Sequence, residues 1–199
     1  MKILSFGAEA QILLKDENTL KKVRTVQEYR HPQLDKRIRK KRTKREFKVL
    51  NKLFNENINV PKVDNLNLDE CSFEMQYIQG KCIIESMNFE TLKLAITQIA
   101  KIHKLEIVHG DLTPLNMLIK DNQIYIIDFG LSEYSKDREE RAVDLNVFFI
   151  FLKNDYPELF KCKDLLLEIY RTEFNDDSQV DEIFTRLEEV EKRGRNKNK

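Results

Sequence analysis

Residue types that mark several common protein classes are scarce in this sequence. Glycine occurs five times and proline four times in 199 residues, and no long flexible linker is visible. The three cysteines are odd in number, widely spaced and without a Cys-x-x-Cys pair; they are Cys71, Cys82 and Cys162. This pattern excludes a disulfide framework and a zinc knuckle, and it is typical of proteins from a reducing cytosol.

Long apolar runs and an excess of one charge are also missing. The most apolar segment, residues 147–152 (VFFIFL), is far too short to span a bilayer, and the N-terminus has no secretory pattern. Lys and Arg number 35 against 34 Asp and Glu, so no overall charge draws the chain toward nucleic acid. With 41% hydrophobic residues, the composition predicts a globular cytoplasmic protein without membrane association.

Hydrophobic periodicity predicts a chain of both strands and helices. Strands are predicted near residues 3–4, 11–14, 19–24, 60–63, 72–78, 117–120 and 123–127. Helices are predicted at residues 34–55 and 89–105 and within 143–187. His103, near the end of the second helix, is expected to pack or cap rather than to bind a ligand. Residues 192–199 form a basic tail that we expect to be mobile.

One acidic residue of the basic helix at residues 34–55 faces the apolar side. Glu46 lies four residues before Leu50 and seven before Leu53, so it shares their face of the helix. A carboxylate that faces a core needs a cationic partner, because its charge is otherwise costly to bury. Local pairing with one of the neighbouring cations is the plain alternative.

Polar residues flank the predicted hairpin at residues 117–127. Asp121-Asn122 is a good tight-turn pair, so the two strands run antiparallel and bring Asn116 and Asp128 close together. Asp111 lies in the loop five residues before Asn116. Two carboxylates and an amide oxygen are ligands that Mg²⁺ prefers. We expect Asn116 and Asp128 to bind the metal, and Asp111 to accept or orient the attacking hydroxyl group or water.

Residues 109–116 (HGDLTPLN) and 128–130 (DFG) resemble the catalytic motifs of protein kinases in order and spacing. The resemblance implies that the chain binds ATP with Mg²⁺ and acts on the terminal phosphate. Gly110 replaces the usual arginine and Thr113 the usual lysine. These departures point away from ordinary eukaryotic protein kinases, in which that arginine contacts a phosphorylated activation loop.

The kinase resemblance also implies a phosphate-anchoring lysine on a strand, paired with a carboxylate on the next helix. Lys22 lies on a predicted strand and shares a face with Leu20, whereas Lys21 is the adjacent competitor. Pairing with Lys22 explains the inward position of Glu46. The family pattern places the remaining nucleotide contacts at Leu4, Gly7, Ala8, Glu9, Ile12, Met75 and Ile78.

A second set of residues resembles a narrower family. Residues 7–10 (GAEA) replace a glycine-rich loop, residues 29–32 (YRHP) precede Arg42-Thr43 and Glu46, and residues 193–195 (RGR) lie in the tail. Together with the catalytic motifs, they look like the small atypical kinase subunit of the KEOPS (EKC) complex, nearly end to end. That family implies an autophosphorylating serine/threonine kinase and ATPase. Its partners are a metal-containing subunit that forms threonylcarbamoyladenosine in tRNA, a small stimulating subunit, and tRNA through the complex.

The fold implied by this resemblance is a reduced two-lobed α+β kinase fold. Residues 1–78 form an N-lobe with an antiparallel sheet and one helix, and residues 79–191 form a small, mostly helical C-lobe. Only about a dozen residues separate Gly130 from the helix near Val143, and no Ala-Pro-Glu motif follows. An ordinary activation segment cannot fit there, which favours water, the chain itself or a docked partner as phosphate acceptor.

Four alternatives stay open at this point. A small-molecule phosphotransferase of the aminoglycoside or choline type needs an additional helical region, and only 55 residues follow Asp144. A RIO-type atypical kinase is closer, but the YRHP segment argues against it. A non-catalytic tRNA-binding subunit could use the cations of residues 36–48 and 192–199, although a solvated helix face is at least as good an explanation. A pseudokinase scaffold has little support, because all the required groups are present.

Overall fold

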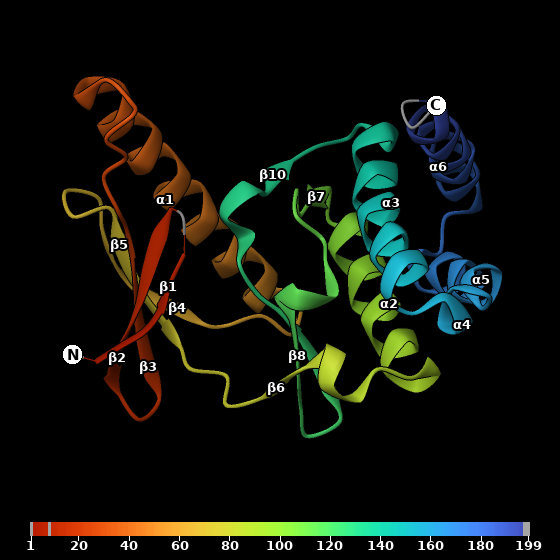
Figure 1. The fold of residues 1–199 in the computed structure, drawn as a ribbon, viewed down its shortest axis with the longest axis horizontal. Helices are drawn as coiled ribbons and strands as arrows, with labels where there is room; N and C mark the ends of the chain where they lie inside the picture. The colour runs from red at the N-terminus through yellow and green to blue at the C-terminus, as the bar shows by residue number, and fades with distance from the viewer. Residues whose placement is uncertain (1, 8, 197–199) are drawn as a thin grey trace. The chain divides into compact units, whose positions relative to one another are not determined.

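The computed structural model of the protein describes residues 2–7 and 9–196, which fall into two compact units (Figure 1). The first unit comprises Met1–Gln79 together with Asp128–Leu131. The second comprises Gly80–Ile127 together with Ser132–Lys199. The Asp-Phe-Gly motif and Leu131 therefore belong to the stranded first unit, although the segments on either side of them belong to the second.

An antiparallel five-stranded sheet forms the first unit, with strand order β1-β2-β3-β5-β4. Its strands are β1 (Lys2–Phe6), β2 (Ala10–Asp16), β3 (Thr19–Arg24), β4 (Val63–Asn67) and β5 (Ser72–Gln76). Asp16 closes the β2–β3 hairpin by accepting a hydrogen bond from the backbone N–H of Asn18 at 3.0 Å. The alternation along β3 buries Leu20, Lys22 and Arg24 on one face.

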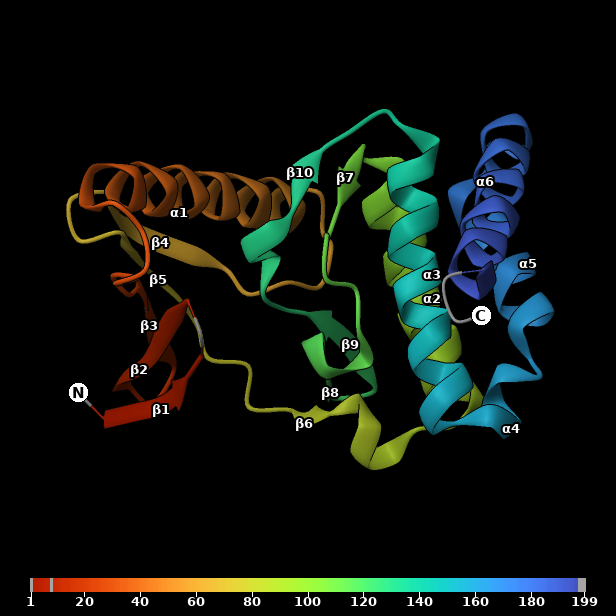
Figure 2. The same cartoon turned by 45° about the horizontal axis from the view of Figure 1, so that its top comes forward.

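The basic helix α1 (Pro32–Asn55) packs on this sheet against β4 and β5 (Figure 2). It begins at a proline in its first turn, where the missing backbone N–H costs no hydrogen bond. Its apolar stripe is fully buried at Val49, Leu50 and Leu53. Phe47 and Phe73 of β5 meet edge to face, with ring centroids 6.0 Å apart. This packing fixes the inward-facing side of α1 over β3 and β5.

The predicted strand at residues 60–63 is misplaced. Strand β4 begins at Val63 and continues to Asn67, beyond the end of the predicted strand. Asn65 adopts a left-handed backbone with φ of 50°, and the register with β5 shifts between Asp64 and Asn67. A bulge of this kind lets polar residues continue a strand that period-two hydrophobicity does not reveal.

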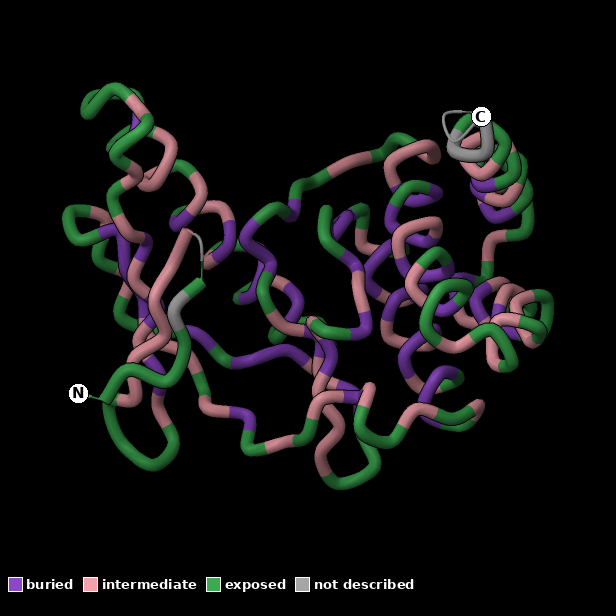
Figure 3. Tube along the Cα trace, in the orientation of Figure 1, coloured by how far each residue is buried: buried purple, intermediate pink, exposed green. Residues whose placement is uncertain are grey.

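The second unit is mostly helical, with two small sheets. Its helices are α2 (Phe89–Lys104), α3 (Arg138–Asp155), α4 (Pro157–Phe160), α5 (Lys163–Phe174) and α6 (Asp177–Asn196). Helix α2 contacts α5, and α3 contacts α6. Most of α2 is buried or half-buried (Figure 3). Asn88 caps α2 by accepting the backbone N–H of Thr91 at 3.0 Å, a reciprocal capping arrangement.

The catalytic-loop hairpin of this unit follows the sequence prediction. Strands β8 (Met117–Lys120) and β9 (Gln123–Ile126) pair antiparallel, and β6 (Lys81–Cys82) extends their sheet. The turn residues Asp121 and Asn122 both adopt positive φ, at 50° and 57°, as a tight two-residue hairpin turn requires. The predicted Asp121-Asn122 turn is confirmed.

The connection between the Asp-Phe-Gly motif and the next helix is shorter than expected. Strand β10 (Glu133–Tyr134) pairs with β7 (Ile107–Val108), and α3 begins at Arg138, not near Val143. Asp137 caps α3 by accepting the backbone N–H of Glu139 at 2.8 Å. The charged first turn of α3 lacks apolar periodicity, which explains the late start in the sequence prediction. Residues 131–137 leave no room for a peptide-docking platform.

The predicted mobile tail is helical over much of its length. Helix α6 continues to Asn196, and residues 197–199 lie outside the described residues. The ion pairs Lys192–Glu188 and Arg193–Glu189 join successive turns and support this extension. No helix among the described residues is long and apolar enough to cross a membrane.

Candidate active site

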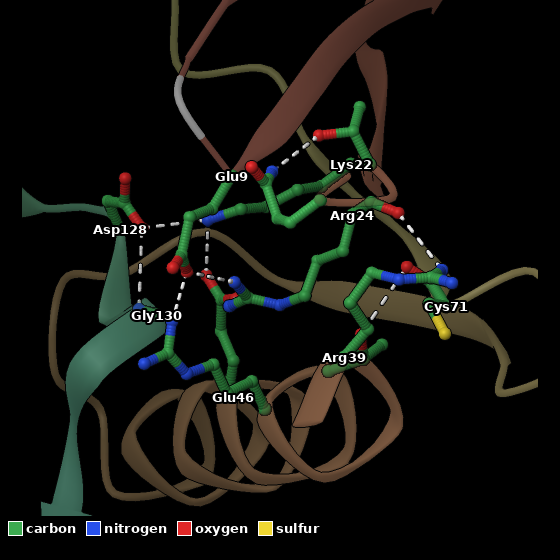
Figure 4. A network of polar contacts seen from close by, with 12 residues as sticks. Glu9, Lys22, Arg24, Arg39, Glu46, Cys71, Asp128 and Gly130 are labelled. Atoms are coloured by element: carbon green, nitrogen blue, oxygen red, sulfur yellow. Dashed lines mark hydrogen bonds and ion pairs between the residues drawn. The ribbon is translucent and has the colours of Figure 1, made fainter. Parts of the chain in front are cut away.

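A buried lysine lies at the centre of the polar network in the first unit (Figure 4). Lys22 is only 5% exposed, on the face of β3 that points toward α1. Its Nζ donates to Glu46 Oε1 at 2.6 Å and to Asp128 Oδ1 at 2.8 Å. The ion pair between Lys22 and Glu46 that the sequence predicts is therefore present. Lys21, the competitor, instead pairs with exposed Glu70 at 2.7 Å.

Glu46 is held by two cations, only one of which the sequence analysis identified. It is 1% exposed, and its second oxygen, Oε2, accepts from Arg24 Nη2 at 2.5 Å. Arg24 lies two residues after Lys22 on β3, so both cations point to the same side of the sheet. One carboxylate thus aligns two buried cations, which fixes the position of the lysine ammonium group.

The electrostatics of this network keep Lys22 charged. Burial alone would lower the pKa of Lys22, but the negative charges of Glu46 and Asp128 outweigh it and raise the pKa above its ordinary value. The ammonium group is therefore protonated throughout the physiological range. A buried lysine that is charged at neutral pH, beside a more exposed carboxylate, is suited to binding an anionic group such as a phosphate.

Asp128 combines an exposed side chain with a constrained backbone. Its side chain is 57% exposed, and its φ is 61°, a left-handed conformation that aspartate tolerates better than most residues. The backbone N–H of Gly130 donates to Asp128 Oδ1 at 3.3 Å. A Cβ atom at Gly130 would lie 3.0 Å from that oxygen and 3.1 Å from Arg24 Nη2. A side chain at this position would therefore have to displace the Asp128 carboxylate and the Arg24 guanidinium group slightly.

The turn between β1 and β2 is tied to the following segment by ion pairs. Glu9 pairs with Arg42, with Arg30 at 3.0 Å and with Arg24 at 3.7 Å. Burial alone would raise the pKa of Glu9, but hydrogen bonds from Arg30 and Arg42 lower it. Its backbone oxygen accepts from Thr25 N–H at 3.1 Å. The carboxylate that was predicted to contact the nucleotide is thus engaged by arginines.

The other predicted nucleotide contacts lie in the same unit but are spread over it. Gly7 donates its backbone N–H to Ala10 O at 2.9 Å and forms the tight turn after exposed Leu4, while Ala8 lies outside the described residues. Ile12 pairs with Lys22 across β2 and β3, and Met75 pairs with Leu20 across β5 and β3. Ile78 is buried. Their contacts with a nucleotide stay predictions.

In the second unit, the structure brings Asp111 and Asn116 together. Asn116 Nδ2 donates to the Asp111 carboxylate oxygen Oδ2 at 3.1 Å and to its backbone oxygen at 2.9 Å. The amide oxygen of Asn116 is left as the acceptor that a cation would need. Asp111 itself is exposed. The ring of His109 connects the Asp111 loop to the end of the hairpin, since its Nε2 lies 3.0 Å from the backbone oxygen of Ile127.

A buried aspartate on α3 anchors the same loop. Asp144 accepts from the backbone N–H groups of His109 at 2.5 Å and Gly110 at 2.9 Å. Burial alone would raise the pKa of Asp144, but the hydrogen bonds from His103 and from the His109 backbone hold it below its usual value. The carboxylate is ionised at neutral pH, and it fixes the backbone just before Asp111.

His103 of α2 belongs to this anchor. Its Nε2 lies 3.3 Å from Asp144 Oδ2, and its Nδ1 lies 3.0 Å from the hydroxyl group of Tyr170 on α5. Burial lowers the pKa of His103 and raises that of Tyr170. A neutral imidazole can donate to the carboxylate and accept from the tyrosine. The packing role predicted for His103 agrees with its buried position and these partners.

Each of the two units carries an oxygen donor of the type that magnesium prefers. Among the described residues, no group of three His, Cys, Asp or Glu side chains forms a ready-made metal site. Mg²⁺ is commonly held by one or two carboxylates with substrate phosphates and water. Asp128, with its exposed carboxylate, and Asn116, with its amide oxygen, supply ligands of that kind. Their roles as metal ligands stay predictions.

Arg24 and Asp144 are the main members of these networks that the sequence analysis missed. Arg24 could have been found from strand alternation, because it shares a face with Lys22. Asp144 could have been noticed as an acid between the apolar Val143 and Leu145. Neither signal identifies the partner, since Asp144 and His109 are 35 positions apart in the sequence.

A family model matches most of this chain, and curated relatives are similar to nearly all of it. A model of the RIO domain matches residues 13–163. The chain is 31% identical to the "probable serine/threonine-protein kinase BUD32 homolog" of Archaeoglobus fulgidus, over 95% of this chain and 93% of that protein. It is 33% identical to the "KEOPS complex subunit Bud32" of Pyrococcus abyssi, over 98% of this chain and 96% of that protein.

A third relative is much longer than this chain. The "probable bifunctional tRNA threonylcarbamoyladenosine biosynthesis protein" of Methanoculleus marisnigri is 34% identical over 95% of this chain, which spans 35% of that protein. Among solved structures, the Rio2 kinase–ADP/Mg²⁺–phosphoaspartate complex of Chaetomium thermophilum matches with a TM-score of 0.65 and 15% identity, over 96% of this chain and 70% of that one. This structural match confirms the predicted α+β kinase-like fold.

Proposed function

Because this chain belongs to the RIO domain family, we propose that it is an ATP-dependent serine/threonine kinase with ATPase activity. The observation that carries the proposal is the network in which buried Lys22 contacts buried Glu46 and exposed Asp128. It holds the positive charge of Lys22 beside the exposed carboxylate of Asp128. That pair is suited to a nucleotide phosphate and to the magnesium ion that accompanies it.

Each type of group that phosphoryl transfer requires has a candidate in this chain. Lys22 binds and orients the phosphates, and Glu46 positions Lys22. Asp128 and Asn116 are the ligands for Mg²⁺, which would neutralise phosphate charge. Asp111 accepts or orients the proton of the attacking hydroxyl group or water. Asp144 keeps the Asp111 loop in place through two backbone hydrogen bonds.

The physiological work that we propose is support of threonylcarbamoyladenosine formation in tRNA, as a subunit of a KEOPS complex. The names of two relatives support it, one as a KEOPS subunit and one as a bifunctional biosynthesis protein. The metal-containing transferase subunit and a small stimulating subunit are the proposed partners. Three free cysteines are in keeping with a cytoplasmic location.

The RIO-type alternative and the KEOPS-type resemblance are two descriptions of one family. The RIO domain match covers residues 13–163, while the two relatives named BUD32 or Bud32 extend over nearly the full chain. The YRHP segment therefore did not separate the two readings as the sequence analysis expected. The short connection at residues 131–137 favours water, the chain itself or a docked partner as phosphate acceptor.

Hydrolysis of ATP by purified variants tests the assigned roles. We expect Asp111→Ala and Asp128→Ala each to abolish nearly all Mg²⁺-dependent phosphate release, with and without the transferase subunit and tRNA. Asp121→Ala, in the exposed hairpin turn, is the matched control and should retain activity. Wild-type turnover in either active-site variant would refute its role. Robust transfer of phosphate to small alcohols would favour a small-molecule phosphotransferase instead.

A further inference from the structure

Helix α1 carries a charge imbalance that the rest of the chain does not share. It contains ten Lys and Arg residues against two carboxylates, whereas the whole chain has 35 against 34. Both carboxylates, Asp35 and Glu46, are buried on the inner side. The outer side of α1 therefore presents only positive charge to solvent.

Four of these cations form a straight row. They are exposed and follow one another at intervals of four, three and four residues, which places them on one face of the helix. They are Arg37, Lys41, Lys44 and Lys48, and we refer to them as the cationic row. Successive members lie at about 5–6 Å between Cβ atoms, so the row extends over roughly 16 Å of the helix.

Among the residues that the structure describes, the cationic row has no acidic partner. In the described part of the chain, none of its four members takes part in an ion pair, although exposed cations elsewhere commonly do. Lys40, on the flank of the same helix, pairs with Asp69 at 2.8 Å, and Lys15 pairs with Glu74 at 2.6 Å. Like charges one turn apart repel and weaken a helix. An arrangement that costs helix stability and has no internal compensation calls for an external anion.

The composition of this face favours a nucleic-acid backbone over an acidic protein. Between Lys36 and Lys48, every exposed residue of α1 is a lysine or arginine. Protein–protein interfaces have an apolar core and few charges at their centre. Nucleic-acid interfaces, in contrast, rest on Lys and Arg contacts with phosphates. A linear row without apolar anchors matches a linear polyanion.

We propose that the cationic row of α1 binds the phosphate backbone of RNA. The choice of RNA among polyanions rests on the proposed function, whereas the row itself does not depend on the kinase chemistry. Contacts of this kind position an RNA without reading its sequence. They also make the affinity steeply dependent on salt, because each neutralised phosphate releases counterions.

Binding of a tRNA transcript to the full chain, measured by fluorescence anisotropy across a salt series, tests this proposal. In the variant Lys41→Glu/Lys44→Glu we expect affinity at low salt to fall at least about tenfold. The slope of log affinity against log salt should decrease by about 1.4–1.8, which corresponds to two lost phosphate contacts. The matched control Lys93→Glu/Lys153→Glu has the same charge change on the second unit and should bind like the wild type.

Two further measurements separate the possible causes of a loss. The charge reversal relieves repulsion along α1, so the thermal unfolding temperature should not fall. The conservative variant Lys41→Arg/Lys44→Arg should keep both affinity and slope. Unchanged tRNA binding by the reversed variant would overturn the proposal. So would a reversal that spares tRNA binding but abolishes association with a protein subunit, because the row would then serve an acidic protein surface.

ATP hydrolysis measured on the same samples keeps this proposal distinct from the proposed function. The reversed variant should hydrolyse ATP like the wild type in the absence of RNA. A chain that binds tRNA through the row but shows no ATP hydrolysis would refute the proposed enzyme and leave the cationic row standing. ATP hydrolysis without any salt-dependent tRNA binding would refute the RNA-binding role of the cationic row and leave the proposed enzyme standing.

Discussion

Replacement of Glu46 by glutamine is the most informative single change in this protein. Glu46→Gln keeps the size of the side chain and removes the charge that Lys22 and Arg24 share. Lys22 would retain Asp128 at 2.8 Å, and Arg24 would retain only the more distant Glu9 at 3.7 Å. In the variant, the buried charge of Arg24 therefore has only a distant carboxylate partner. The buried charge of Lys22 keeps one of its two carboxylate partners.

The size of the effect follows from the burial of the groups. Removing one partner of a buried ion pair costs roughly 3–5 kcal/mol, because the other charge stays behind. We expect about 3 kcal/mol, at the lower end, since Asp128 and the new amide oxygen offset part of the loss. For a chain of this length, about 2–4 °C is lost per kcal/mol, so the melting temperature should fall by roughly 6–12 °C.

The same change should alter the dependence of stability on pH. The pKa of Lys22 is raised in the folded protein, so its contribution is complete below the ordinary lysine value of 10.5 and is lost as the pH rises through the folded value. In Glu46→Gln, burial still lowers the pKa of Lys22 while one of the opposing charges is gone. Alkaline destabilisation should therefore begin at a lower pH than in the wild type.

Urea unfolding between pH 7 and pH 11 measures both effects, and ATP hydrolysis over the same range reports on Lys22. The control is Glu70→Gln, which breaks the ion pair between Glu70 and Lys21 at a similar distance but at the surface. Exposed ion pairs contribute about 0–1 kcal/mol to the free energy of unfolding, so this variant should be nearly as stable as the wild type. A Glu46→Gln protein within about 1 kcal/mol of the wild type would refute the reasoning.

Three further outcomes are expected. Asp144→Asn offers one acceptor where two backbone N–H groups now bind, so it should lose about 2–4 kcal/mol in denaturant unfolding and reduce ATP hydrolysis; full activity would contradict the anchoring role. Because burial lowers the pKa of His103 from 6.5, the unfolded chain binds the proton more readily, and stability should decline as the pH falls below that value. His103→Gln should flatten this decline, and an unchanged pH profile would count against it. Gly80→Ala would place a Cβ atom 2.7 Å from the backbone oxygen of Ile119, so it should lower the melting temperature by an amount equivalent to about 1–3 kcal/mol, which calorimetry would detect.

Local rules predicted those parts of the site that depend on one element at a time. The inward position of Glu46 followed from its spacing to Leu50 and Leu53, and the tight turn at Asp121-Asn122 followed from residue type. The choice of Lys22 over Lys21 followed from strand alternation. In each case, the answer depends on helical or strand periodicity within a few residues.

Interactions between distant segments were beyond the sequence. Nothing in the neighbourhood of Arg24 shows that Glu46 has room for a second cation, because that depends on how α1 packs over β3. Asp144 accepts from backbone groups of His109 and Gly110, which carry no side-chain signature of their own. The bulge at Asn65 likewise arises from pairing with β5. Because the sequence does not reveal it, the strand was predicted too early, at residues 60–63.

Helix α1 is one continuous helix of 24 residues, about 36 Å long, and its opposite sides contact different surroundings. Glu46 faces inward to Lys22, and Lys44, two residues earlier, faces solvent in the cationic row. A ligand that fixes the outer side also restrains the inner side, because the helix backbone joins them. Thermodynamic reciprocity then applies: if bound RNA changes nucleotide affinity by some factor, bound nucleotide must change RNA affinity by the same factor.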